Sequence, residues 1–202
     1  MTPLPFESDA AVHWDFSYDA EWFLPLPTSD DLHREPLAGE EWIEGAVAHY
    51  TERAELTAGD REALTVTAEA LLSLVGNAAT QLWFTPRGVY SDVVVEVTVA
   101  AAAAMEADKV LEELATLPDA TASELIALDT DAHGHGFLLR RTSAVVLEDQ
   151  ARPIANWTVL LRKGEWAIMV MAMGSTLEAF ALMEEHILRV VQGITLPSGS
   201  PQ

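Results

Sequence analysis

The sequence predicts an α+β fold, in which a single domain carries an antiparallel sheet covered by helices on both faces, an α/β/α sandwich. Four strand-like runs follow one another over residues 123–173 with short turns between them, which is typical of an antiparallel meander. The last run, residues 165–173, is apolar on both faces and should therefore be buried on both sides. A long amphipathic helix is then expected over residues 175–193.

The N-terminal third is predicted to be an arm followed by two helices. Residues 1–39 contain five prolines and are expected to be extended, with one strand over residues 13–18, where aromatic residues alternate with others. A helix is expected from about residue 40, because its apolar residues recur at intervals of three and four. A second helix is expected to follow the N-cap Thr57 and to end at Gly76.

The remaining elements are expected to be a hairpin, a helix, the meander and the closing helix. The hairpin and the helix after it are predicted over residues 80–85, 93–100 and 105–117. The meander strands are predicted over residues 123–129, 137–148, 154–162 and 165–173. Ser175 and Glu178 form a capping-box pattern at the start of the closing helix, and Gly193 marks its end. We expect one domain over residues 1–197 and a disordered tail over 198–202.

The charge of the chain limits its partners. The net charge is −21, and residues 1–130 contribute −20 of it, from 25 acidic and five basic residues. Such a surface repels phosphate, so we expect no nucleic acid and no anionic membrane as a partner. Beyond solubility, the charge suggests that the acidic N-terminal half contacts another protein.

Composition excludes several classes of protein. The chain has no cysteine, which rules out disulfides, thiolate metal ligands and cysteine nucleophiles. It has no basic, apolar signal at its start and no run of about 20 apolar residues, so a cytoplasmic protein is expected. The excess of alanine, and of arginine over lysine, suggests a GC-rich bacterial genome, such as that of an actinobacterium.

Residues 130–136, TDAHGHG, contain the candidate metal ligands. His133 and His135 are two residues apart, a spacing that places both imidazoles on one face of an extended strand. Asp129 and Asp131 are the acidic residues that could complete the set of ligands. Two imidazoles alone make a weak site, so a metal would need one of these carboxylates.

Two glycines argue against a metal site in this segment. Gly134 and Gly136 are expected to interrupt the strand that would fix the two imidazoles. Loops rich in aspartate, glycine and threonine are common without metal. The sequence therefore favours an exposed hairpin connection over a metal site.

Several other patterns have a structural and a functional interpretation. The tryptophans and the methionines at 169, 171 and 173 could line a binding surface, but their strand positions favour core packing. Four arginines near the paired strands could bind an anion, but ordinary salt bridges are favoured because acidic residues outnumber basic residues 32 to 11. These arginines are Arg140, Arg141, Arg152 and Arg162.

No catalytic or cofactor motif is present. The segment MGSTL has one of the two glycines of a nucleophile elbow, and there is no phosphate-binding or dinucleotide-binding loop. We therefore predict no catalytic residue and no cofactor. The sequence favours a non-catalytic binding or accessory protein; the alternative is a small-molecule-binding or metal-dependent enzyme that uses His133 and His135.

The C-terminal half resembles a known family in its order of elements. Residues 156–196, which end in Gly193-Ile194-Thr195-Leu196, resemble the PsbP-like group of α/β/α sandwiches. The resemblance extends over about residues 80–197 and implies a role in binding rather than catalysis, with no catalytic residues to transfer. A helix-grip ligand-binding sandwich also ends in a long helix on an antiparallel sheet, and it is the competing fold.

Overall fold

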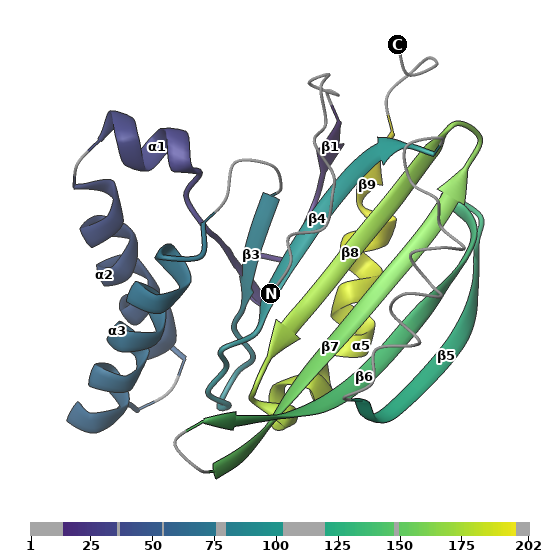
Figure 1. Ribbon diagram of the computed structural model, residues 1–202. Coiled ribbons are helices and arrows are strands. Elements are labelled where there is room, and N and C mark those ends of the chain that lie inside the picture. Colours follow the sequence, from purple (N-terminus) through teal and green to yellow (C-terminus); the bar gives the residue numbers. More distant parts are fainter. Residues whose placement is uncertain are drawn as a thin grey trace.

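The chain folds as an α+β protein with four helices beside a large antiparallel sheet in the part that the structure describes (Figure 1). This computed structural model describes residues 14–35, 37–53, 55–75, 80–102, 120–147 and 150–196. The predicted helix over residues 105–117, the first 13 residues of the predicted arm and the predicted tail 198–202 lie outside the described residues.

The main sheet is open and antiparallel throughout. Its seven strands lie in the order β2-β3-β4-β8-β7-β6-β5, so β2 and β5 form its two edges. The strands are β2 (Phe23–Pro25), β3 (Thr80–Phe84), β4 (Val94–Ala101), β5 (Ala120–Thr130), β6 (Gly134–Leu147), β7 (Gln150–Lys163) and β8 (Trp166–Gly174). The six strands predicted from residue 80 onward are confirmed, because alternation and short turns are local signals that the folded sheet preserves.

One face of the sheet is covered by the closing helix α5 (Leu177–Gln192), which lies behind the sheet in Figure 1. Seven side chains of α5 are buried, and all of them except His186 belong to the same core cluster as the alternate valines of β4 and Val170 of β8. The predicted burial of strand 165–173 is confirmed on both faces for Trp166, Ile168 and Met169, which are all buried. The methionine run is not buried throughout: Met171 is half-buried, and the core packing expected for Met173 is wrong, because 41% of that residue is exposed at the end of β8.

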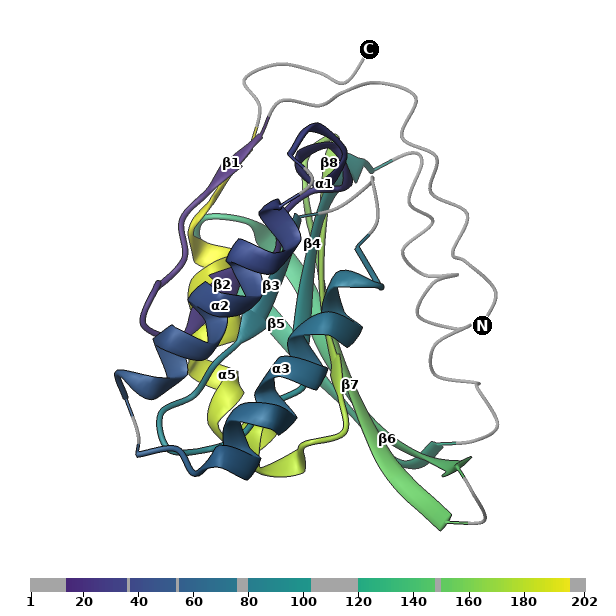
Figure 2. The same cartoon turned by 90° about the vertical axis from the view of Figure 1, so that its left-hand side faces the viewer.

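Helices α2 (Ala38–Thr51) and α3 (Ala58–Leu72) pack against the other face of the sheet at its β2–β3–β4 end. Trp83 of β3 is fully buried between them and the sheet, together with Tyr50 of α2. Figure 2 shows the two helices side by side. Among the described residues, helices therefore cover one face along α5 and the other face at one end.

The predicted extended arm contains more regular structure than the sequence analysis anticipated. It includes β2 and a short helix, α1 (Ser29–Arg34), which begins with a capping box formed by Thr28 and Asp31. The predicted strand over 13–18 shortens to β1 (Asp15–Phe16), which pairs with β9 (Ile194–Thr195). Prolines led to the extended prediction, but an edge strand such as β2 tolerates Pro25.

The two predicted capping boxes have different outcomes. Thr57 and Asp60 form theirs at the start of α3, as predicted. The box predicted from Ser175 is wrong, because Thr176 is the N-cap of α5 and makes no side-chain capping bond within the helix. Instead, the carboxylate of Asp92 accepts hydrogen bonds from the amide and hydroxyl groups of both Ser175 and Thr176 at 2.5–2.9 Å.

Gly193 ends α5, as predicted, but for an unexpected reason. Its φ is −76°, so it does not use the left-handed conformation that makes glycine common after helices. A side chain at this position would meet the carbonyl oxygen of Ser17 at 2.4 Å. Glycine is required because β1 approaches closely, and the Ser17 amide donates to the Gly193 carbonyl at 3.0 Å.

Candidate functional site

The segment with the candidate metal ligands forms a tight hairpin between β5 and β6. Thr130 pairs with Gly134, and the three residues between them make the turn. The Thr130 hydroxyl accepts a hydrogen bond from the His133 amide at 3.0 Å and donates one to the Gly134 carbonyl at 3.3 Å. The predicted hairpin is present. The expected interruption of the strand is wrong, because Gly134 and Gly136 both lie in β6, where β7 approaches closely enough to exclude a side chain.

His133 is buried, contrary to the prediction that this loop is exposed throughout. Only 4% of the residue is exposed. Its imidazole lies near the last carbonyls of α5, at Val191 and Gln192, but neither ring nitrogen hydrogen-bonds to a described residue. Burial lowers the pKa of His133, the charge of Lys163 adds to this effect, and the two carbonyls oppose it. His133 is therefore a neutral packing residue at pH 7.

His135 points away from His133. It shares the sheet face of Leu139, opposite α5, and its Nδ1 lies 3.0 Å from Asp129 Oδ1 on the neighbouring strand. Both side chains of this pair are largely exposed, and Asp131 is exposed in the turn. The spacing of two would place both histidines on one face only if both were in the strand, but His133 is in the turn.

The structure therefore does not bring the predicted ligands together around one point. In the described ranges, no group of three or more His, Cys, Asp or Glu side chains is placed to hold a metal ion. The His135–Asp129 pair supplies two of the donors that a metal site needs. The third candidate donor, the imidazole of His133, is buried near the end of α5 and does not reach this pair. The described arrangement gives no support to the metal-dependent alternative.

Arg140 forms the salt bridges that the sequence analysis favoured. It lies on the α5 face, with its guanidinium 4.5 Å from the centre of the Trp157 ring. It also pairs with Glu124 of β5 at 3.3 Å and with Glu184 of α5 at 2.5 Å. A cation held by a ring and two carboxylates has little capacity left for an anionic ligand.

The other three arginines do not join Arg140. Arg141 lies on the opposite sheet face and is buried, and its Nε makes no hydrogen bond to any described residue. Arg152 and Arg162 are exposed at separate positions along β7. The four arginines that could have bound an anion together are thus divided between two faces of the sheet, because successive strand residues alternate.

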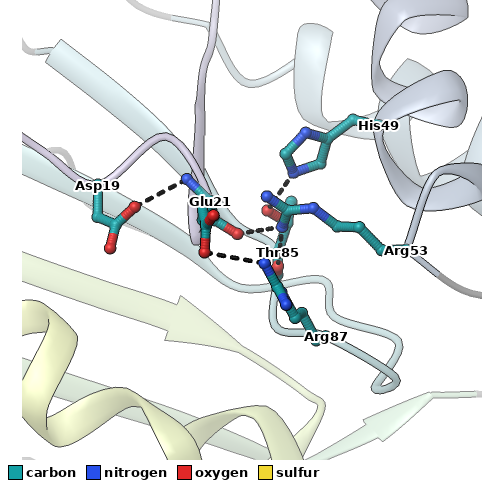
Figure 3. Close-up of polar contacts among 6 residues, drawn as sticks. All are labelled: Asp19, Glu21, His49, Arg53, Thr85 and Arg87. Atoms are coloured by element: carbon teal, nitrogen blue, oxygen red, sulfur yellow. Dashed lines mark hydrogen bonds and ion pairs between the residues drawn. The ribbon is translucent and has the colours of Figure 1, made fainter.

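A second polar cluster connects α2 to the β2–β3 edge of the sheet (Figure 3). The guanidinium of Arg53, just after α2, donates to the main-chain carbonyls of Glu21 and Thr85. His49 Nε2 lies 3.0 Å from the Thr85 hydroxyl. Arg87 pairs with the Glu21 carboxylate at 2.9 Å. These contacts join three chain segments that are far apart in sequence.

This cluster holds the helix in place rather than forming a catalytic site. A histidine beside a hydroxyl is the arrangement of a base with a nucleophile, but Thr85 is only 1% exposed, so a substrate has no access to it. Burial, followed by the charge of Arg53, lowers the pKa of His49, while Glu52 opposes the change. The neutral His49 and the charged Arg53 together fix the C-terminal end of α2 against the sheet.

A groove of about 650 Å³ lies between α2 and α3, next to this fixed end. Its apolar floor comes from Ile43, Val47 and Ala48 of α2. Glu44 and Glu52 stand on the α2 side. The remaining lining residues are Thr51, Arg61 and Thr65. The groove is open to solvent rather than enclosed.

The groove belongs to a strongly acidic part of the surface. We call residues 29–75, which contain α1, α2 and α3, the acidic helical lobe. It has eleven acidic and three basic residues, a net charge of −8, and every one of its acidic residues is exposed. Among its described residues, one ion pair, Arg34–Asp30, joins two members of the lobe. The lobe therefore presents a largely uncompensated negative field.

Sequence reasoning found the apolar stripe of α2 but not the groove. The apolar stripe of this helix contains Ile43, Val47 and Tyr50; Tyr50 is buried, and the other two pack against the same core cluster but remain half-buried beside the groove. His49 and Arg53 are four residues apart and therefore lie on the same side of the helix. This spacing is a sequence signal that one side of α2 is polar and can make the contacts that fix it to the sheet.

Comparisons of the sequence with family models and with curated proteins give no match. Among the described residues, no helix is both long enough and apolar enough to cross a membrane.

Proposed function

We propose that this chain is a non-catalytic binding protein whose acidic helical lobe docks a basic amphipathic helix of a partner protein in the groove between α2 and α3. The observation that carries the proposal is the combination, in one place, of an apolar floor with acidic flanks. An amphipathic helix that lies in a groove uses both features: its apolar side chains enter the groove, and its basic residues meet the flanks.

The apolar floor supplies the affinity in this proposal. Ile43 and Val47 are half-buried, so each retains apolar surface that a partner can remove from water. Burial of such surface contributes about 25 cal/mol per Å² before the costs of association. A third helix laid along α2 and α3 would have the packing geometry of an ordinary helix pair on each side.

The negative charge of the acidic helical lobe determines which partner segments are attracted to the groove. A net charge of −8 over the lobe attracts a basic segment and repels nucleic acid and a second copy of the chain. Arg61 is the one basic residue of the groove lining, while Arg53 is turned toward the sheet. Charge complementarity of this kind mainly accelerates association and selects among partners.

The alternative that uses His133 and His135 has no supporting geometry, since the two side chains point away from each other. We also propose the complete α/β/α sandwich, of the PsbP-like kind, in preference to the helix-grip alternative. Burial of Leu160, Ala167 and Met169 on the face away from α5 supports this choice.

The proposal can be tested with a designed peptide. The probe is a fluorescent helical 18-residue peptide with leucines on one face and lysines on the other, titrated with the full chain. We expect saturable binding that weakens as salt is raised. Ala48→Lys, at an exposed position in the groove lining, should weaken binding by about tenfold, which corresponds to about 1.4 kcal/mol.

A matched variant separates position from charge. Ala70→Lys makes the same substitution at an exposed alanine of α3 that does not line the groove, and it should change binding little. A peptide with glutamates in place of the lysines should not bind. Equal effects of the two lysine variants, or equal binding of the acidic peptide, would disprove docking in this groove.

A further inference from the structure

The edge strand β5 has an exposed side that no strand occupies within the described residues. It is the last strand of the sheet order and pairs along Ala120–Thr130 with β6 alone. Its length of eleven residues exceeds that of most strands. In Figure 1 it forms the rim of the sheet farthest from the helical lobe. A long free edge presents a row of backbone donors and acceptors to solvent.

The two edges of the sheet differ in how they are protected. β2, at the other edge, is three residues long, contains Pro25 and leads into α1, so it offers little to a further strand. Residues 121–130 of β5 contain no proline, lysine or arginine. The register shift between Ala120 and Ala122 affects only the start of the strand. Most of β5 thus lacks the features that usually prevent strand addition.

The acidic residues of β5 are already engaged by its own neighbour. Glu124 pairs with Arg140 at 3.3 Å and Asp129 pairs with His135 at 3.0 Å, both across the β5–β6 ladder. Between them lies the uncharged stretch Leu125–Leu128. Leu125 is 60% exposed on the face away from α5, so it retains apolar surface that an added strand can remove from water.

We propose that the free edge of β5 accepts an extended segment of a partner protein as an added antiparallel or parallel strand, one with apolar residues alternating with basic residues. The edge groups of the backbone bind the added strand, and Leu125 packs against one of its apolar residues. This inference is carried by β5 alone and does not depend on the groove of the helical lobe.

The charge of the chain selects this occupant over a second copy. Pairing of β5 with β5 of another copy would bring two chains of net charge −21 together. The side chains of Glu124 and Asp129 remain largely exposed despite these pairs, and Glu184 of α5 adds a third carboxylate next to Arg140 of β6. A basic strand meets this surface with opposite charge, and a second copy meets it with like charge.

The experiment uses a blocked ten-residue peptide of alternating valine and lysine as the probe, with the full-length protein. Hydrogen exchange of individual β5 amides is measured with and without the peptide. We expect amides of residues 121–130 to exchange at least tenfold more slowly when the peptide is bound. Two versions of the peptide, N-methylated at its odd or its even residues, should differ, because only one removes the donors that face β5.

Two matched variants place the contact. Leu125→Lys and Val66→Lys make the same kind of change at side chains of similar exposure, one on β5 and the other on α3. Leu125→Lys should weaken peptide binding at least fivefold, whereas Val66→Lys should leave it unchanged. Ala48→Lys, the groove variant, should also leave the slowed exchange of β5 intact, so the two proposals fail or succeed separately.

Three results would overturn the inference. Protection confined to α2 and α3 would place the peptide in the groove instead. Equal binding of the unmodified peptide and both N-methylated peptides would exclude backbone pairing. A concentration-dependent dimer that protects the same amides without peptide, and that Leu125→Lys dissociates, would make a second copy the occupant of the edge.

Discussion

Helices α5 and α2 are of similar length but make contrasting use of their side chains. α5 buries seven of its 16 residues against the middle of the sheet, and α2 buries two of its 14. Ile187 of α5 is fully buried, whereas Ile43 of α2 remains half-buried beside the groove. α5 lies across the widest part of the sheet, while α2 packs where the short edge strand β2 and β3 offer little surface.

This difference separates a helix that builds the core from one that presents a surface. The free energy of unfolding should depend mainly on α5, because buried apolar area dominates stability. The acidic helical lobe is held by a smaller core around Trp83 and by the polar contacts of Arg53. The proposed docking of a partner helix would use the remaining apolar and acidic surface of the lobe, which the core does not need.

The same substitution in both helices should show the largest difference. Ile187→Ala should lower the free energy of unfolding by about 3–4 kcal/mol, because it removes buried methyl groups and leaves a cavity. Ile43→Ala should lower it by about 1–1.5 kcal/mol, because that side chain is half-buried and leaves no closed cavity. Urea unfolding followed by tryptophan fluorescence measures both, and equal losses would contradict the contrast.

A substitution at the N-terminus of α5 should also lower the free energy of unfolding more than a substitution at the N-terminus of α3. Asp92→Ala should lower the free energy of unfolding by about 2 kcal/mol, because one carboxylate accepts bonds from two amides and two hydroxyls at the start of α5. Asp60→Ala, at the exposed capping box of α3, should have a smaller effect. Urea unfolding at pH 7 provides the comparison.

The contribution of Asp92 should also depend on pH. Burial alone would raise the pKa of Asp92, but the hydrogen bonds from Ser175 and Thr176 outweigh it and lower the pKa below its usual value. The contribution is therefore complete above the unfolded-state pKa of about 3.9 and is lost as the pH falls through the folded-state pKa. A loss of this contribution near pH 6 would contradict the assigned hydrogen bonds.

Substitution of the two histidines of the hairpin should give the smallest difference in the free energy of unfolding. His135→Ala should change the free energy of unfolding by no more than about 0.5 kcal/mol, since the side chain is exposed. His133→Ala should cost about 1 kcal/mol or more, since it empties a buried position. If both chains unfold like the parent, the burial of His133 is wrong.

Acid provides an independent check on His133. Burial lowers its pKa, so below about pH 6.5 the unfolded chain binds a proton more readily than the folded chain. Stability should therefore fall as the pH drops from 6.5 toward the folded-state pKa, and His133→Ala should reduce that fall. His186 is buried as well, and its pKa is lowered by burial and Arg189 against Glu185 and Asp19. It should retain part of the slope in the variant.

Local signals account for what the sequence predicted correctly. The alternation of residues 93–100 places each valine from its nearest neighbours, and the capping box of Thr57 and Asp60 needs only three residues of separation. Extended and helical periods depend on the chain alone, so they hold wherever the element packs. The strands from residue 80, both long N-terminal helices and α5 could all be predicted in this way.

The sequence by itself thus determined the strands from residue 80 onward, the helices α2, α3 and α5, the burial of most of β8 and the acidic character of the N-terminal half. Only the tertiary structure decided the capping of α5 by Asp92, which lies 83 residues before Ser175, and the burial of His133 beneath α5. It also decided that α2 leaves a groove and that β5 ends the sheet. These features depend on which surfaces meet, and contacts between residues far apart in the chain leave no periodic signal in the sequence.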